Sequence, residues 1–236
     1  MTMRVGPAAR LRDLAGAMGI ALDIAAAGRM VALLDRLALE TQNLTTIDPF
    51  DGGLERHLAD SLSGATIAAL RTAPEIVDIG SGGGFPGLPI AMLRPDCAVT
   101  LVESERRKAD WLARAAADLP NVRVVADRAE NLASVERERW AVATARALAP
   151  LPVVLELAAP LVRVGGSIVA WRGPRDVAEE ARAAVAAGML GLEVGPVRAV
   201  APFPGAERHL HEYLKVERTP SRFPRRPGRA GKRPLA

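Results

Sequence analysis

The stretch Glu75-Ile-Val-Asp-Ile-Gly80-Ser-Gly-Gly-Gly-Phe-Pro-Gly87 decides the fold of this 236-residue chain. A short apolar run ends near Asp78 and passes directly into five glycines within eight residues. Glycine permits positive φ and lets the backbone approach a ligand without interference from a Cβ atom. A helical pattern follows at Leu88-Pro89, and proline suits a first helical turn. A strand, a glycine-rich loop and a helix in this order predict a ligand site at the carboxyl edge of a parallel sheet.

The next predicted strand, 98–103, ends in an acid. Glu103 follows Gly80 by 23 residues, a spacing from which a carboxylate can accept hydrogen bonds from ribose hydroxyls. The loop and the acid together predict a nucleoside cofactor. A tight structural turn without a ligand is the alternative.

The kind of cofactor depends on Asp78. Gly82, Gly84 and Gly87 fit the G-x-G-x-x-G pattern of dinucleotide sites, so the glycines alone do not exclude NAD. A carboxylate just before the loop would repel a pyrophosphate, whereas it would attract a sulfonium and an amino group. This favours S-adenosylmethionine. A NAD(P)-dependent oxidoreductase is the alternative, but no Tyr-x-x-x-Lys pair supports it, because the single tyrosine is Tyr213.

Two later strand ends complete the predicted site. Ala129 and Glu130 follow strand 122–126, where they can read an adenine edge; alternatively, Asp127 and Glu130 cap the next helix. Arg146 follows strand 140–144, at the end that faces the transferred group. Arginine cannot act as a base at neutral pH but can bind a phosphate or a carboxylate. We therefore expect a reaction that needs no deprotonation by the enzyme.

The apolar pattern divides the chain into three parts. Residues 1–70 read as a helical extension with helices at 8–18, 25–39 and 54–70 and a turn-rich piece at 41–53. Residues 71–217 alternate short apolar runs with amphipathic stretches, which predicts a Rossmann-like α/β core with a mostly parallel seven-stranded sheet. The predicted strands are 75–79, 98–103, 122–126, 140–144 and 167–171, with a closing hairpin of 192–200 and 211–217; the predicted helices are 88–93, 106–117, 153–161 and 176–187.

The third part, 218–236, is a basic tail rich in proline and glycine. The chain has a net charge of +4, but the tail contains seven bases and no acid, so residues 1–217 carry a charge of −3. We expect this tail to pack in no core and to lie along a polyanion. Truncation after Glu217 should then weaken binding to the polyanion and leave cofactor affinity nearly unchanged. A merely solubilising tail is the alternative.

Composition excludes several other classes of protein. The chain is 49% hydrophobic, as globular proteins are, and no apolar run approaches the roughly 18 residues that span a bilayer. Residues 1–12 show no secretory signal. The single cysteine, Cys97, excludes a disulfide framework and a multi-cysteine zinc site, and His209 and His211 alternate in a strand, so they make a poor metal pair. We expect a monomeric cytoplasmic protein without a metal.

Several motifs resemble one family along nearly the whole chain, the bacterial 16S rRNA guanine-N7 methyltransferases, also called glucose-inhibited division protein B. The glycine loop is shared by many methyltransferases, whereas its Phe-Pro-Gly ending, the element 56–62 and the closing Arg-Pro-Gly…Lys232-Arg-Pro-Leu235 are more specific. The matching motifs are Asn43-Leu-Thr45, Arg56-His57-Leu-x-Asp60-Ser61-Leu62, Asp78 to Gly87, Leu101-Val-Glu-Ser104, Arg128-Ala-Glu130, Thr144-Ala-Arg-Ala147 and Phe223-Pro-Arg-Arg-Pro-Gly228. One departure is Trp171-Arg-Gly173, where family members commonly have Lys before the glycine.

The resemblance implies a class I fold, S-adenosylmethionine as cofactor, and methylation of guanine N7 in 16S rRNA, either in the small ribosomal subunit or in its assembly intermediate. Guanine N7 has a free lone pair and loses no proton, which agrees with a site without a base. A non-catalytic RNA-binding protein with a retained pocket is the alternative. The predicted cofactor-binding residues are Asp78, Gly80, Gly82, Phe85, Glu103, Ala129, Glu130 and Arg146. The candidate RNA-binding residues are Arg56, His57, Arg172, Arg222, Arg225 and Arg226. For His57 a structural role is favoured over RNA contact, and a chemical role comes last.

Overall fold

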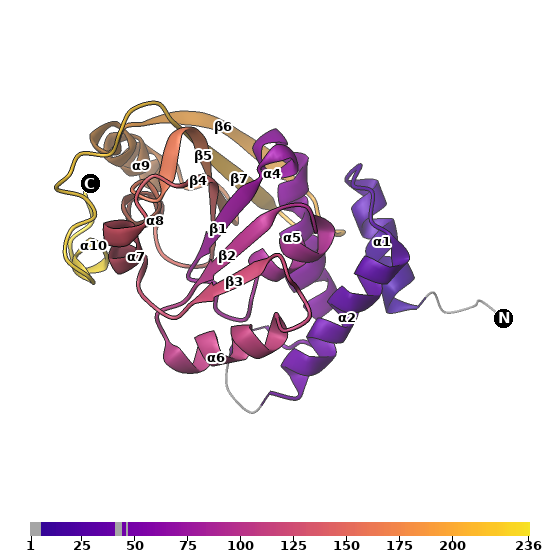
Figure 1. Cartoon of the computed structure of the whole chain (residues 1–236). Helices are drawn as coiled ribbons and strands as arrows, with labels where there is room; N and C mark the ends of the chain where they lie inside the picture. The colour runs from indigo at the N-terminus through magenta and orange to yellow at the C-terminus, as the bar shows by residue number, and fades with distance from the viewer. Residues whose placement is uncertain (1–5, 41–43, 46) are drawn as a thin grey trace.

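The computed structural model of the protein describes residues 6–40, 44–45 and 47–236. These residues form a seven-stranded sheet in the order β3-β2-β1-β4-β5-β7-β6, with helices on both faces (Figure 1). Strands β1 to β5 run parallel, and β7 lies antiparallel between β5 and β6. The predicted class, a mostly parallel Rossmann-like sheet closed by a hairpin, is confirmed.

The elements have the following bounds. The strands are β1 (Glu75–Ile79), β2 (Ala98–Val102), β3 (Val122–Val125), β4 (Trp140–Arg146), β5 (Val162–Arg172), β6 (Leu192–Val200) and β7 (Arg208–Lys215). The helices are α1 (Pro7–Ala17), α2 (Ile24–Ala38), α3 (Asp60–Leu62), α4 (Ala68–Thr72), α5 (Gly87–Leu93), α6 (Arg106–Ala115), α7 (Ala129–Val135), α8 (Leu151–Ala158), α9 (Val177–Leu190) and α10 (Arg229–Lys232), with a π-helical turn η1 (Leu54–Ala59) and a 3₁₀ turn η2 (Ser63–Thr66).

Side chains that alternate along the strands build a hydrophobic core on each face of the sheet. In β1, Ile76 belongs to the core that also contains residues of α1, α2, α5 and α6, whereas Val77 and Ile79 belong to the core that contains residues of α7, α8 and α9. Successive side chains of a strand point to opposite faces, so a strand buried on both faces reads as a continuous apolar run. Cys97 lies in the first core, fully buried, and burial raises the pKa of its thiol to about 11.

The helix predicted over 54–70 is not continuous. The chain passes from η1 through α3 to η2, then becomes extended at Ile67 before α4 begins. Gly64 in this stretch lies against the Trp171 ring so closely that a Cβ atom would be 2.3 Å from the indole. The interrupted segment therefore packs closely against the Trp171 indole of β5. The predicted turn-rich piece 41–53 begins at residues 41–43, which lie outside the described residues. Asn43 of the quoted motif is one of them.

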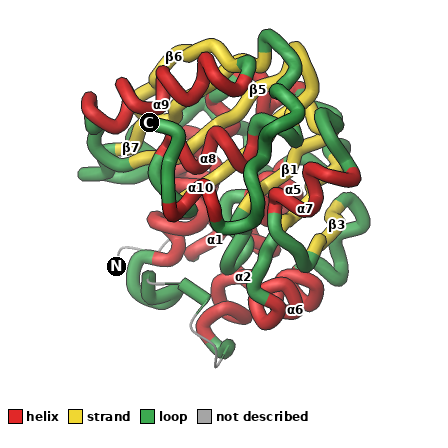
Figure 2. Tube along the Cα trace, turned by 90° about the vertical axis from the view of Figure 1, so that its left-hand side faces the viewer, coloured by secondary structure: helices red, strands yellow, loops and turns green. Residues whose placement is uncertain are grey.

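The C-terminal segment 218–236 packs against the body of the protein, so the expectation that it packs in no core is wrong. Phe223 is 3% exposed and belongs to the core under α8 and α9, and Ala230 of α10 is 4% exposed. The segment lies beside α7 and α8, on the opposite side of the molecule from α1 and α2 (Figures 1 and 2). Phe223 and Ala230 provide the apolar contacts through which this segment, otherwise rich in proline and arginine, packs on the rest of the protein.

None of the helices formed by the described residues is long and apolar enough to cross a membrane. Nor do three or more His, Cys, Asp or Glu side chains gather in the described part of the chain in a way that could hold a metal ion.

Candidate active site

The glycine loop after β1 is held against the end of β2. The backbone N–H groups of Gly80 and Ser81 both donate to the carbonyl oxygen of Val102, at 2.9 and 3.1 Å. Gly80 has φ +65°, and a Cβ atom there would lie 2.4 Å from Leu148 Cδ1. Only glycine therefore fits this position, and the loop forms the floor of a cavity of about 890 Å³ at the carboxyl edge of the sheet.

Glu103 stands at the wall of this cavity, where the spacing predicted an acid. Its Oε2 accepts a hydrogen bond from the Gly82 N–H at 2.9 Å, and its Oε1 accepts one from the Glu105 N–H at 2.8 Å. The carboxylate is 7% exposed and lines the cavity beside Ser104. Glu103 thus fixes the glycine loop and is placed to accept bonds from a ligand.

Asp78 lies behind the glycine loop and is not among the residues that line the cavity. Its Oδ1 accepts a bond of 2.7 Å from the Thr144 hydroxyl, and its Oδ2 has no partner among the described residues. Burial raises the pKa of this carboxyl to about 6, although the Thr144 hydrogen bond opposes the shift. A buried carboxylate with an open oxygen provides a negative potential under the loop, which suits a cationic ligand.

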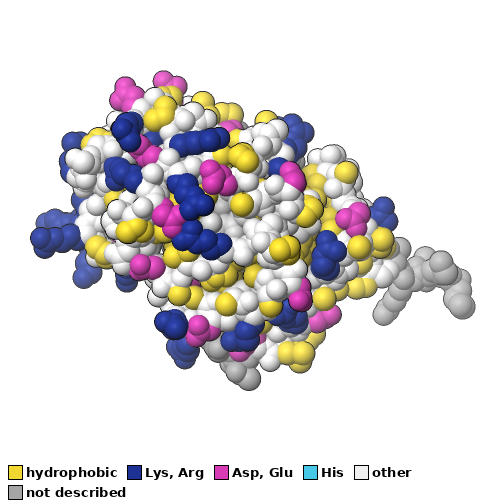
Figure 3. Space-filling view, in the orientation of Figure 1, with side chains coloured by type: hydrophobic (Ala, Val, Ile, Leu, Met, Phe, Trp, Pro, Cys, Tyr) yellow, Lys and Arg dark blue, Asp and Glu magenta, His cyan; other side chains and the backbone are white. Residues whose placement is uncertain are grey.

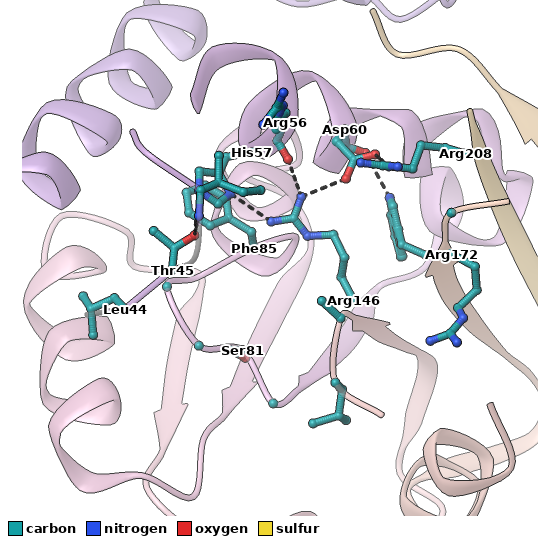
Figure 4. Close-up of a pocket in the computed structure, with 18 of the residues that line it drawn as sticks. Leu44, Thr45, Arg56, His57, Asp60, Ser81, Phe85, Arg146, Arg172 and Arg208 are labelled. Atoms are coloured by element: carbon teal, nitrogen blue, oxygen red, sulfur yellow. Dashed lines mark hydrogen bonds and ion pairs between the residues drawn. The ribbon is translucent and has the colours of Figure 1, made fainter. Parts of the chain in front are cut away.

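Arg146, at the end of β4, is fixed from several sides (Figure 4). Its Nη1 donates to Asp60 Oδ2 and to the Arg56 carbonyl oxygen, both at 2.9 Å, and its guanidinium lies 5.4 Å from the centre of the Phe85 ring. Asp60 is 4% exposed and accepts a second cation through Oδ1, from Arg208 Nε of β7 at 3.0 Å. A buried carboxylate thus holds two arginines at one end of the cavity.

His57 is neutral and is bound on both ring nitrogens. Its ring stacks on Phe85 at 4.4 Å between centroids, and its Nδ1 lies 3.2 Å from Arg146 Nη2. Arginine can only donate, so Nδ1 accepts, and Nε2 carries the hydrogen that it donates to Thr45 Oγ1 at 3.0 Å. Burial and the charge of Arg146 lower the pKa of His57 to about 4. The geometry agrees with the structural role favoured for His57, whose ring contacts Arg146 and Phe85.

The other predicted RNA-binding residues fall into three settings. Arg56 lines the cavity and is exposed to solvent. Arg172 also lines the cavity, but its Nη2 donates to both carboxylate oxygens of Glu179, at 2.7 Å each. Arg222 and Arg226 are exposed on the C-terminal segment, whereas Arg225 is paired with the buried Glu156.

A second, smaller cavity of about 200 Å³ continues from the first past Gly80, Ser104 and Leu148, which line both. Ala129 and Glu130 lie in its wall, as the sequence predicted for the adenine end of the site. The capping alternative is not observed, because α7 has no side-chain cap and Glu130 Oε1 instead accepts a bond from the Gly228 N–H.

The structure thus brings most of the predicted residues together. Gly80, Gly82, Phe85, Glu103, Arg146, Arg56, His57 and Arg172 line the larger cavity, and Gly80, Ala129 and Glu130 line the smaller one. Sequence reasoning assigned no role to Asp60, Lys108, Arg208 or Gly228. Asp60 lies within the Arg-His-Leu-x-Asp-Ser-Leu motif, which was the one signal available for it.

Known proteins are similar to this chain in sequence and in fold. A family model described as rRNA small subunit methyltransferase G, GidB, matches residues 29–210. The chain is 43% identical over 199 residues to "Ribosomal RNA small subunit methyltransferase G" of Chloroflexus aggregans, with 82% of each chain covered. It is 34% identical over 227 residues to the protein of the same name from Thermotoga neapolitana, with 95% of this chain and 98% of the relative covered.

Among solved structures, Aeropyrum pernix fibrillarin with natively bound S-adenosyl-L-methionine matches with a TM-score of 0.52 and 17% identity. The match covers 66% of this chain and 73% of that one. At this identity the likeness concerns the fold alone.

Proposed function

This chain belongs to the rRNA small subunit methyltransferase G family, and from that premise we propose that it transfers the methyl group of S-adenosylmethionine to N7 of a guanine in 16S rRNA. Membership makes the chain an S-adenosylmethionine-dependent rRNA methyltransferase. The target atom is our proposal. The observation that carries it is a cofactor-sized pair of cavities on the glycine loop whose histidine is neutral and hydrogen-bonded on both nitrogens.

The residues present fit this cofactor. Gly80 and Gly82 line the cavity without a side chain, Glu103 offers carboxylate oxygens at the cavity wall, and the open Oδ2 of buried Asp78 provides a negative potential beneath the loop. When bound, S-adenosylmethionine supplies an electrophilic methyl group on a sulfonium. The neighbouring cavity beside Ala129 accommodates the adenine end of the same molecule.

The chemistry of guanine N7 matches the titratable groups around the cavity. N7 attacks with its own lone pair and loses no proton, so the protein has to hold the base in line and needs no base of its own. Of the described acids that line the cavity, Asp60 and Glu179 are ion-paired, and Glu103 and Asp176 accept hydrogen bonds from backbone N–H groups. His57 has a pKa lowered to about 4 and no free nitrogen. Five basic and four acidic side chains line the same cavity, a net charge of +1, and the exposed Arg56 is available there to RNA phosphates.

The setting of the reaction is also proposed. We place the chain in the cytoplasm, acting as a monomer on 16S rRNA within the small ribosomal subunit or its assembly intermediate. Residues 1–70 would serve as a helical extension, 71–217 as the cofactor-binding core and 218–236 as a basic terminal segment.

The test is methyl transfer from labelled S-adenosylmethionine to small ribosomal subunits from cells that lack the modification, followed by nuclease mapping. Label on guanine N7 is expected, and naked 16S rRNA run in parallel identifies the substrate form. Cofactor binding without transfer to either substrate would contradict the proposed substrate and favour a non-catalytic RNA-binding protein.

Glu103→Ala tests the cofactor site in the same assay. We expect its affinity for S-adenosylmethionine to fall at least tenfold, because the substitution removes both the ligand-facing oxygens and the bond to Gly82. Glu193→Ala, at an exposed acid on β6, is the matched control and should bind like the wild type. Equal affinity of all three proteins would refute the assigned cofactor position.

A further inference from the structure

The C-terminal segment is attached to the core at two buried points. Arg137 donates to the carbonyl oxygens of Thr219 and Phe223, at 2.7 and 2.8 Å, and so holds the segment by its backbone. The Phe223 side chain is buried in the core beneath α8 and α9. These contacts fix the path of the segment up to residue 223.

The second attachment is a buried ion pair. Glu156 of α8 is 1% exposed, and its carboxylate accepts from Arg225 Nε at 2.7 Å and from Nη2 at 2.5 Å. Removing one partner from a buried pair leaves an uncompensated charge, which is strongly unfavourable. Arg225 is therefore committed to α8, and the residues that follow it are directed toward α7.

The segment then reaches the smaller cavity and closes one side of it. The Gly228 N–H donates to Glu130 Oε1 at 2.9 Å, and Gly228, Ala230 and Gly231 all line the cavity. Across from them the lining comes from Gly80 of the loop, Ala129 of α7 and Leu148. The wall facing the strand ends is thus made from the last part of the chain.

We propose that residues 228–231 form the outer wall of the adenosine end of the cofactor site, so that cofactor affinity depends on the C-terminal segment being docked. The proposal rests on the proposed function, because it takes the smaller cavity as the place of the adenine. A ligand with its ribose at Glu103 can extend past Gly80 and Ser104, which line both cavities, and its base then lies against Ala230 and Leu148.

This reverses the expectation drawn from composition, that truncation leaves cofactor affinity unchanged. The segment has two faces. Its inner face, with Phe223 and Ala230, is buried, while Arg222 and Arg226 are exposed on the outside. Any ligand that favours the docked segment must strengthen cofactor binding by the same factor that the cofactor strengthens it, since coupling is reciprocal.

The test measures dissociation constants by calorimetry for S-adenosylhomocysteine and for 5′-methylthioadenosine, which has the adenosine end without the amino-acid part. Truncation after Pro227 should weaken both ligands at least tenfold, and by a similar factor. Ala230→Leu, which keeps the segment but fills the cavity from its wall, should do the same. Lys232→Ala lies on the same short helix without lining the cavity and serves as the control, with a change below twofold.

Each outcome decides between the proposals. If the full chain binds neither ligand, the proposed function fails. A second outcome is that the full chain binds while both variants, shown to be folded by circular dichroism, have dissociation constants within twofold of its value. In that case the proposed role of residues 228–231 as a cavity wall is wrong, and the cofactor assignment stands. If truncation prevents folding, Ala230→Leu alone decides.

Discussion

Charged side chains around the cavity hold one another in fixed positions. Asp60 accepts from Arg146 and Arg208, which belong to different strands, and Glu179 holds Arg172 through both of its oxygens. These ion pairs fix the positions of the side chains at one end of the cavity. The titrations of His57 and Asp78 are the most direct check on the site.

His57 should stay neutral well below the pH at which histidine normally gains a proton. Its folded pKa of about 4 lies below the ordinary 6.5, so the stability it contributes is complete above pH 6.5 and is lost as the pH falls toward 4. A nuclear magnetic resonance titration can check this, since the chain has only three histidines. A midpoint near 6.5 for His57 would contradict the buried bond to Arg146.

Asp78 should show the opposite dependence in the cofactor-free protein. Its folded pKa of about 6 lies above the ordinary 3.8, so its contribution is complete below pH 3.8 and is lost as the pH rises through 6. Relative to Asp78→Asn, the wild type should lose about 2 kcal/mol of unfolding free energy between pH 4.5 and 7. Urea unfolding at both pH values measures the difference, and parallel curves for the two proteins would refute it.

At the scale of elements, the interrupted helical segment 54–72 connects the larger cavity to β5. It carries His57 and Asp60 to the cavity, and the Asp60 carbonyl oxygen accepts a 2.9 Å bond from Trp171 Nε1 of β5. Gly64 packs against the Trp171 indole, and the extended backbone at Ile67 ends this helical stretch before α4 begins.

Gly64→Ala tests this packing. The new Cβ would lie 2.3 Å from Trp171 Cζ2, so we expect a loss of about 1–3 kcal/mol in unfolding free energy, measured by urea denaturation. Gly188→Ala, on the exposed side of α9 with no atom within 4 Å of the new Cβ, should instead be neutral or stabilise by up to about 1 kcal/mol. Equal effects of the two substitutions would argue against the contact with the indole.

What the sequence could predict at this scale was local. The strand ends, the glycine loop and the spacing to Glu103 follow from short patterns. The structure brings the loop, Glu103 and Arg146 to one cavity and Ala129 and Glu130 to the neighbouring one. The pairing of Asp60 with Arg208 spans 148 residues, and the helix break depends on an indole more than a hundred residues away, so neither leaves a periodic signal. The composition of the C-terminal segment led to the wrong expectation because its two buried side chains, Phe223 and Ala230, are few among many bases.

On the scale of the whole molecule, the basic side chains of the C-terminal segment remain available although its backbone is docked. Dark-blue Lys and Arg atoms gather at the left edge in Figure 3, where Figure 1 places this segment. Arg222 and Arg226 are exposed, in contrast to Arg225. The segment can therefore contact a polyanion from outside while its inner face completes a cavity.

The double substitution Arg222→Ala with Arg226→Ala should weaken RNA binding at least threefold. It should also make the slope of log affinity against log salt shallower by about 1.5, because two phosphate contacts are lost. S-adenosylhomocysteine affinity should not change. Filter binding over a salt series measures both quantities, with Arg163→Ala and Arg182→Ala, two exposed arginines on β5 and α9, as the charge-matched control. An unchanged slope would exclude these two arginines from the RNA surface.

The burial of Cys97 has a consequence for watching this segment directly. The chain's only thiol is fully buried and has a pKa of about 11, so maleimide and methanethiosulfonate reagents should leave the native protein unlabelled. A single Lys232→Cys substitution then gives one reactive handle, beside the smaller cavity and on the exposed side of α10. A spin label or fluorophore at that position would report the docking of the segment in real time, without signal from a label on Cys97.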